Sequence, residues 1–143
     1  MIPLLPVSRA RFLGLLAAAV ASAALAGCAA FAPASPEERV RERAQARWDA
    51  LLSGDIERAY AFLSPGSRGV VSLSRYRMSI GASASWKSAK VHSVACPQAD
   101  RCKVTMLVAY TPVLPRSRVA IIETSVDETW LFEEGQWWLP HGL

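Results

Sequence analysis

The chain has 143 residues, of which 52% are hydrophobic and 20% are charged, and its formal net charge is +4. Residues 1–27 hold two of the 16 basic residues and none of the acidic ones, so the other 116 residues carry 14 basic and 12 acidic side chains, a charge of only +2. So weak a charge argues against a nucleic-acid partner, and the length suits one domain with a single core.

Residues 1–27 have the three parts of a secretory signal peptide. Arg9 and Arg11 form a basic start, residues 12–26 are uncharged and rich in Leu, Ala and Val, and small residues follow. The apolar run is shorter than the roughly 20 residues that a membrane-spanning helix needs. Residues 1–27 are therefore predicted to be a signal for export. This signal is either an ordinary cleaved peptide that Cys28 follows by chance, an N-terminal anchor that is not cleaved, or a lipoprotein signal.

Leu25-Ala26-Gly27-Cys28 resembles the lipobox of bacterial lipoproteins. The resemblance implies cleavage before Cys28, lipid (including a fatty acyl chain such as palmitate) on Cys28, and a tether over residues 28–35. Two or more acyl chains hold a protein firmly on a membrane. Ala29, where Asp commonly signals inner-membrane retention, implies an outer-membrane anchor with the protein facing the periplasm.

Cys96 and Cys102 remain as an even pair in an oxidising compartment, which predicts a disulfide across a hairpin turn. Two cysteines alone lack the further ligands of a zinc site. The five intervening residues differ from the two that are usual in redox-active pairs. We predict no metal site.

Residues 36–143 are expected to form one domain that opens with a long helix. Ser35 suits the N-cap, Pro36 the first turn, and Glu38 completes a capping box. An apolar stripe follows at helical spacing, and Gly54 ends the helix. The stripe comprises Val40, Ala44, Trp48, Leu51 and Leu52. The opposite face is charged and predicted to be solvated, with binding of anionic lipid headgroups as the alternative. It comprises Arg39, Arg41, Glu42, Arg43 and Asp49.

Two shorter helices are expected next. Asp55 caps the first, whose stripe runs from Ile56 to Leu63, and Ser64-Pro65-Gly66 is expected to end it. Residues 67–71 are predicted to be a loop. Ser72 or Ser74 starts the second of these helices, and residues 81–85 are a break.

From Trp86 onward the hydrophobic period changes to two, which predicts strands. A bulge is expected after Val91, a second strand over residues 102–110, a loop over 111–117, and a third strand over 119–132. Residues 133–136 then form a hairpin turn into Trp137-Trp138-Leu139. The fold class is α+β: three N-terminal helices packed on a curved four-stranded antiparallel sheet.

The chain also resembles the nuclear-transport-factor-2-like (cystatin-like) superfamily of cone-shaped α+β domains. The matching residues are Ala44-x3-Trp48-x2-Leu51-Leu52-x-Gly54-Asp55, Ala59-Tyr60-x-Phe62-Leu63-Ser64, Tyr76, and Glu128-x-Trp130-x4-Gly135-x-Trp137-x-Leu139. The resemblance implies a sheet wrapped around the first helix. It covers roughly residues 36–140 and leaves function open.

Enzymes of that superfamily typically place an acid or histidine inside the cone. The candidates here are His92, Glu123, Asp127 and Glu128, and strand alternation lets only one of Asp127 and Glu128 face inward. His92 is expected to be a surface or satisfied strand residue, and His141 to be exposed. We predict no catalytic residues and no cofactor.

Most of the aromatic residues are expected to pack in the core. The alternative is a pocket lined by Trp48, Tyr60, Tyr76 and Trp137 that binds an apolar ligand. The leading functional hypothesis is a membrane-anchored envelope lipoprotein whose domain is a non-enzymatic interaction or assembly module, with an envelope protein or a second copy as partner. The first alternative is a binder of a small apolar ligand or lipid. The second is a cofactor-free isomerase or dehydratase.

Overall fold

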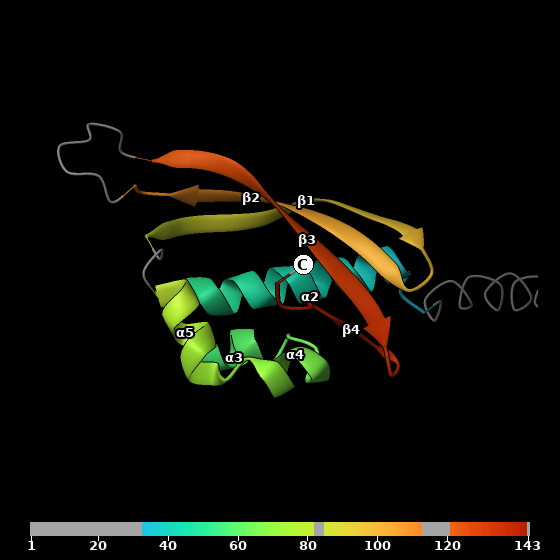
Figure 1. Ribbon diagram of the computed structural model, residues 1–143. Coiled ribbons are helices and arrows are strands. Elements are labelled where there is room, and N and C mark those ends of the chain that lie inside the picture. Colours follow the sequence, from blue (N-terminus) through green and yellow to red (C-terminus); the bar gives the residue numbers. More distant parts are fainter. Residues whose placement is uncertain (1–32, 82–84, 113–120, 143) are drawn as a thin grey trace, which may run out of the picture. The chain divides into compact units, whose positions relative to one another are not determined.

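A computed structural model describes residues 33–81, 85–112 and 121–142, and the labels used below are those of Figure 1. The predicted signal peptide, Cys28 and most of the tether lie outside the described residues, as does most of the loop predicted over residues 111–117. Residues from Ser35 onward form one unit.

The long helix α2 spans Pro36–Leu52 and begins where the capping pattern predicts. Ser35 Oγ accepts a hydrogen bond from the Glu38 amide at 3.1 Å, and the Ser35 amide donates to Glu38 Oε2 at 2.8 Å. Gly54 follows with a φ of +78°, a left-handed conformation that glycine adopts without strain. The capping box and the glycine stop are therefore confirmed.

The helices after α2 differ from the sequence prediction at one point. Helix α3 spans Ile56–Tyr60 behind its N-cap Asp55, and α5 spans Leu73–Gly81, both in predicted regions. Residues 67–71, predicted to be a loop, lie largely in a further helix, α4 (Pro65–Val70). Ser64 caps it, with Ser64 Oγ accepting from the Ser67 amide at 3.1 Å. A Ser-Pro pair starts a helix as readily as it ends one, because proline suits the first helical turn.

Four antiparallel strands follow in the spatial order β1-β2-β3-β4. They are β1 (Trp86–Gln98), β2 (Arg101–Tyr110), β3 (Ile122–Glu133) and β4 (Gln136–Trp138). The predicted α+β class, with helices packed on a four-stranded antiparallel sheet, is confirmed. The expected bulge is also present, as a register shift between Val91 and Ser93.

One face of the sheet is apolar and α2 lies along it, with α3, α4 and α5 on the far side of that helix (Figure 1). The core holds side chains from α2 and from alternate positions of β2 and β3. Its members include Val40, Ala44, Trp48, Leu51, Cys102, Val104, Met106, Val108, Trp130 and Trp137. The other sheet face carries mostly small and polar side chains.

Three local features stabilise the turns and the edge of the sheet. Glu134 and Gly135 have φ values of 51° and 78°, the two left-handed residues of a tight hairpin turn. Cys96 and Cys102 are joined by a disulfide across the β1–β2 turn. At the β1 edge, Gln45 of α2 donates to the Ala89 carbonyl and accepts from the Val91 amide, each at 3.0 Å.

Within residues 33–81, 85–112 and 121–142, we find no helix of the length and apolarity needed to cross a membrane.

Candidate functional site

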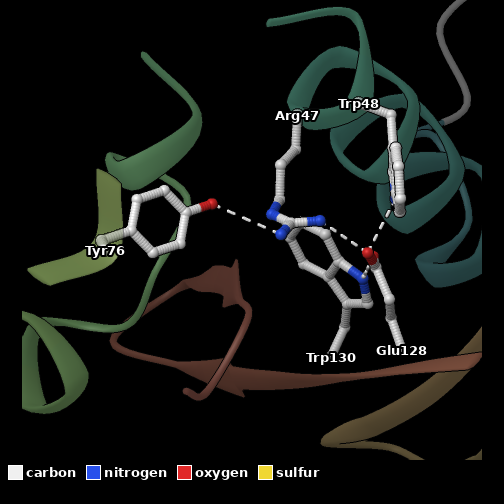
Figure 2. A network of polar contacts seen from close by, with 5 residues as sticks. All are labelled: Arg47, Trp48, Tyr76, Glu128 and Trp130. Atoms are coloured by element: carbon white, nitrogen blue, oxygen red, sulfur yellow. Dashed lines mark hydrogen bonds and ion pairs between the residues drawn. The ribbon is translucent and has the colours of Figure 1, made fainter. Parts of the chain in front are cut away.

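A buried ion pair joins α2 to β3 at the centre of the domain. Arg47 Nη1 donates to Glu128 Oε1 at 2.6 Å, and both side chains are largely buried. Two indole N–H groups also donate to this carboxylate: Trp48 Nε1 donates to Oε1 at 2.7 Å, and Trp130 Nε1 donates to Oε2 at 3.1 Å. Figure 2 shows these donors converging on Glu128. We call Arg47, Trp48, Tyr76, Glu128 and Trp130 the polar cluster.

The sequence pattern explains how these side chains meet. Strand alternation directs Glu128 and Trp130 to the same inner face of β3, whereas Asp127 lies on the outer face. On α2, Arg47 lies three residues after Ala44 and four before Leu51, so it falls within the buried stripe. This spacing could have identified Arg47, which the sequence analysis did not single out.

The pairing makes the charged groups tolerable in the core. An isolated buried carboxylate or guanidinium is strongly unfavourable, and a hydrogen-bonded partner of opposite charge offsets that cost. Oε1 of Glu128 accepts two hydrogen bonds and Oε2 accepts one. The carboxylate therefore acts as an acceptor that ties the helix to the sheet.

The polar cluster leaves some of its hydrogen-bond donors without an acceptor among the described residues. The buried Arg47 Nε–H has none. Arg47 Nη2 donates to the Tyr76 hydroxyl at 3.3 Å, so that oxygen acts as an acceptor and the phenolic proton is left over. Tyr76 is only 2% exposed.

A pocket of about 240 Å³ lies beside the polar cluster. It is lined by Arg47, Leu63 and Tyr76, by residues 127–129 of β3, and by the segment from Leu139 to Gly142. The exposed ring of His141, in that segment, packs edge-on to Tyr76 with 6.5 Å between ring centroids.

The four aromatic residues predicted to line a pocket occupy different places. Tyr76 lines the pocket just described, and Trp48 binds Glu128 within the polar cluster. Tyr60 packs on Tyr76, 5.5 Å between centroids, and its hydroxyl donates to the Val71 carbonyl at 2.6 Å. Trp137 is buried against Phe132, and its Nε1 has no acceptor within the described part of the chain.

Of the four titratable candidates on the sheet, Glu128 alone faces the core. His92 and Glu123 are exposed. Asp127 accepts hydrogen bonds from Lys103 at 2.9 Å and from Thr105 at 2.8 Å on the outer face. The Lys103 hydrogen bond, followed by that of Thr105, lowers the pKa of Asp127 below its ordinary value. Among the described residues, His, Cys, Asp and Glu form no group of three that could hold a metal ion.

Part of the helix face predicted to be solvated packs instead on aromatic rings of the β3–β4 hairpin and on Phe62. The Arg39 guanidinium lies 5.7 Å from the centre of the Phe132 ring, and that of Arg43 lies 5.0 Å from Phe62 and 5.3 Å from Trp138. Partial burial lowers the pKa of Arg43 from its ordinary value. Long basic side chains cover aromatic rings in this way while their ends reach polar partners.

A second distinctive feature is the exposure of two large apolar side chains, one at the end of α4 and one on α5. Val70 is 74% exposed and Met78 is 70% exposed, both unusually high for large hydrophobic residues. An open groove of about 590 Å³ runs beside Met78 and is also lined by Ser72, Leu73, Ser74 and Arg77. We call this region the α4–α5 surface.

No model of a known protein family matches the chain, and no curated protein matches it. The chain is similar in structure to solved proteins, and two of these are described as SEC-C motif containing proteins. The one from Rhodopseudomonas palustris has a TM-score of 0.53 and 16% identity, over 76% of this chain and 77% of the other. The one from Psychrobacter arcticus has a TM-score of 0.57 and 8% identity, over 77% of this chain and 63% of the other, which is less than two thirds of its length.

These comparisons correct the family assignment made from the sequence. The similar structures are SEC-C motif containing proteins and not nuclear-transport-factor-2-like lipoproteins, so that assignment is wrong. The physical reason is that the matching residues are scaffold signals. A helix stop at Gly54-Asp55 and a tight turn at Glu134-Gly135 serve many α+β folds of this element order. Identities this low show the fold alone.

Proposed function

We propose that this chain is exported to the cell envelope, is held on the membrane by lipid on Cys28, and acts as a non-enzymatic module that binds another protein through its α4–α5 surface. The observation that carries the proposal is the exposure of Met78 beside an open, mostly apolar groove, with a second exposed apolar side chain, Val70, at the end of α4. Exposed apolar side chains gathered on one surface are typical of interaction sites.

The charge of the α4–α5 surface indicates which kind of partner protein binds it. Residues 65–81 contain three arginines, Arg68, Arg75 and Arg77, and no acidic residue. Glu57 of α3 lies 3.5 Å from Arg77, and this exposed pair is weak. An acidic segment of a partner protein with a few apolar side chains complements this surface in both charge and polarity.

The shape of the surface favours a protein over a lipid bilayer. Bilayers take up apolar side chains that project from a convex helix face, whereas side chains of a partner protein fill a groove. Methionine is adaptable and suits such a groove. Two copies of the same basic surface repel each other, which disfavours self-association through it.

The polar cluster supports a non-enzymatic role, because its carboxylate accepts three hydrogen bonds that hold the fold together. The disulfide supports an oxidising compartment, where such bonds persist. The proposed lipid anchor rests on residues 25–28 of the sequence alone.

Cell fractionation tests the anchor. The Cys28→Ser chain should move from the membrane fraction to the soluble envelope fraction, whereas a Cys96→Ser, Cys102→Ser control should stay with the membrane. Retention of the Cys28→Ser chain on the membrane would contradict the anchor.

Photo-crosslinking tests the surface. With p-benzoylphenylalanine in place of Met78, irradiation of the cells that naturally make this chain should give one protein adduct of discrete mass. The same group in place of Ser125, exposed on the outer sheet face, is the matched control and should give none. Lipid adducts only, an adduct with a second copy, or equal adducts from both positions would each contradict the proposal.

A further inference from the structure

A separate pocket of about 280 Å³ combines basic and aromatic side chains. It shares no lining residue with the pocket beside the polar cluster or with the groove at Met78. We call it the Arg43 pocket. Its lining residues come from α2, from α3 and the two residues after it, and from β4: Arg43, Arg58, Ala61, Phe62, Gln136 and Trp138.

The guanidinium of Arg43 is held in place by its neighbours. Its Nε donates to the Trp137 carbonyl at 2.7 Å, and the group packs on the rings of Phe62 and Trp138. The Trp138 ring is fixed in turn, because its Nε1 donates to the Glu133 carbonyl at 3.2 Å. The remaining edge of the planar guanidinium, formed by Nη1 and Nη2, therefore has a defined orientation.

This edge is accessible to a ligand. Among the described residues, neither Nη1 nor Nη2 of Arg43 has a hydrogen-bond acceptor. In that part of the chain the buried donors without a partner are Arg47 Nε and Trp137 Nε1, so the two terminal nitrogens of Arg43 are open to solvent. Gln136 adds a further donor, since its Oε1 is occupied by the Trp137 amide at 3.1 Å and its amide nitrogen has no acceptor in the described ranges.

The charge around the pocket favours an anion. Two arginines line it, and no acidic residue does. A third arginine, Arg68 of α4, lies 5.6 Å from the centre of the Trp138 ring. The ion pairs formed within the described residues involve Arg47, Arg77 and Lys103, so the three arginines at this pocket are not neutralised by an acidic side chain there. An added anion supplies the missing charge.

We propose that the Arg43 pocket binds a small aromatic carboxylate. The two carboxylate oxygens accept from Nη1 and Nη2 of Arg43, the geometry in which arginine binds carboxylates best. Arg58 adds attraction, and the aromatic part of the ligand packs on the rings of Phe62 and Trp138.

The mostly apolar lining distinguishes a carboxylate of this kind from inorganic phosphate. Phosphate is more strongly hydrated and has no apolar part, so it gains nothing from the two rings. A volume of about 280 Å³ limits the ligand to about one ring. This site goes beyond the proposed function, because it uses none of the residues that line the groove at Met78.

The probe is benzoate, with its neutral isostere benzamide and inorganic phosphate as comparisons at equal ionic strength. The full sequence is expressed for export with Cys28→Ser, so that no lipid anchor or detergent competes for the probe. The Arg43 Nε–H signal in a ¹H–¹⁵N spectrum reports on the guanidinium. Benzoate should shift this signal saturably in the millimolar range, and benzamide and phosphate should each bind at least tenfold more weakly.

Matched arginine variants locate the site. Arg58→Gln removes an exposed positive charge from the pocket and should raise the benzoate Kd about threefold. Arg101→Gln makes the same change on an exposed residue at the start of β2, outside the pocket, and should leave the Kd unchanged. No saturable shift with benzoate, equally tight binding of benzamide or phosphate, or equal Kd values in the two variants would overturn the proposal.

Discussion

A single buried carboxylate organises the interior of this domain. Glu128 of β3 accepts hydrogen bonds from the Arg47 guanidinium and the Trp48 indole of α2, which lie 81 and 80 residues away in the sequence. It also accepts one from the Trp130 indole of its own strand. Such a pair contributes modestly when complete, but loss of one charge leaves the other buried without compensation. The cluster therefore fixes the position of α2 on the sheet more than it adds stability.

The Glu128→Gln variant tests this role. It keeps the shape of the side chain but leaves the Arg47 charge unbalanced, and its amide nitrogen faces a donor. We expect unfolding in urea to show a loss of about 3 kcal/mol. Glu123→Gln, an exposed change on the same strand, should alter stability by less than about 0.5 kcal/mol. Equal stability of the two variants would show that the ion pair is dispensable.

At this scale the sequence predicts only one partner of the ion pair. Alternation along β3 shows that Asp127 and Glu128 cannot both face inward, and the structure places Glu128 inside. Arg47 escapes prediction because arginine on a helix is ordinarily solvated, although its spacing from Ala44 and Leu51 is that of a core residue.

At the scale of elements, the sequence predicts those helix starts and turns that depend only on neighbouring residues. The start of α2 depends on Ser35, Pro36 and Glu38, and the β3–β4 turn depends on Glu134 and Gly135, so both are predictable. Helix α4 is not, because its sequence, Pro-Gly-Ser-Arg-Gly-Val, contains two glycines and has little intrinsic helix preference. The Ser64 cap and tertiary contacts decide its structure.

The β1 edge gives a prediction of its own. Gln45 occupies the free hydrogen-bonding groups of Ala89 and Val91, which protects this edge from pairing with another chain. In the Gln45→Ala variant, hydrogen exchange of the Val91 amide should accelerate about tenfold, since the variant loses a hydrogen bond of about 1 kcal/mol and gains exposure. The Val108 amide in the central strand β2 is the internal control. Unchanged exchange at Val91 would mean that Gln45 does not protect the edge.

At the scale of the whole molecule, the fold class follows from the sequence but the binding features do not. Three segments with apolar residues at helical spacing, followed by four segments of alternating apolar and polar residues, are sufficient to predict an α+β fold. The pocket is formed by segments that are distant in the sequence, and the α4–α5 surface is defined by the exposure of its side chains. The periodicity of apolar residues shows neither. The polar pocket combines residues of α2, α5, β3 and the segment after β4.

The α4–α5 surface combines exposed apolar side chains with the arginines Arg75 and Arg77 of α5, and it suits an acidic protein partner.

The most direct measurement of the central claim is a charge exchange on the crosslinking chain. With p-benzoylphenylalanine at position 78, Arg75→Glu together with Arg77→Glu should reduce the protein adduct at least tenfold, because two attractions become repulsions. Lys87→Glu together with Lys90→Glu changes the net charge equally, on exposed residues of β1, and should leave the adduct unchanged. Equal yields from both double variants would contradict an acidic partner on the α4–α5 surface.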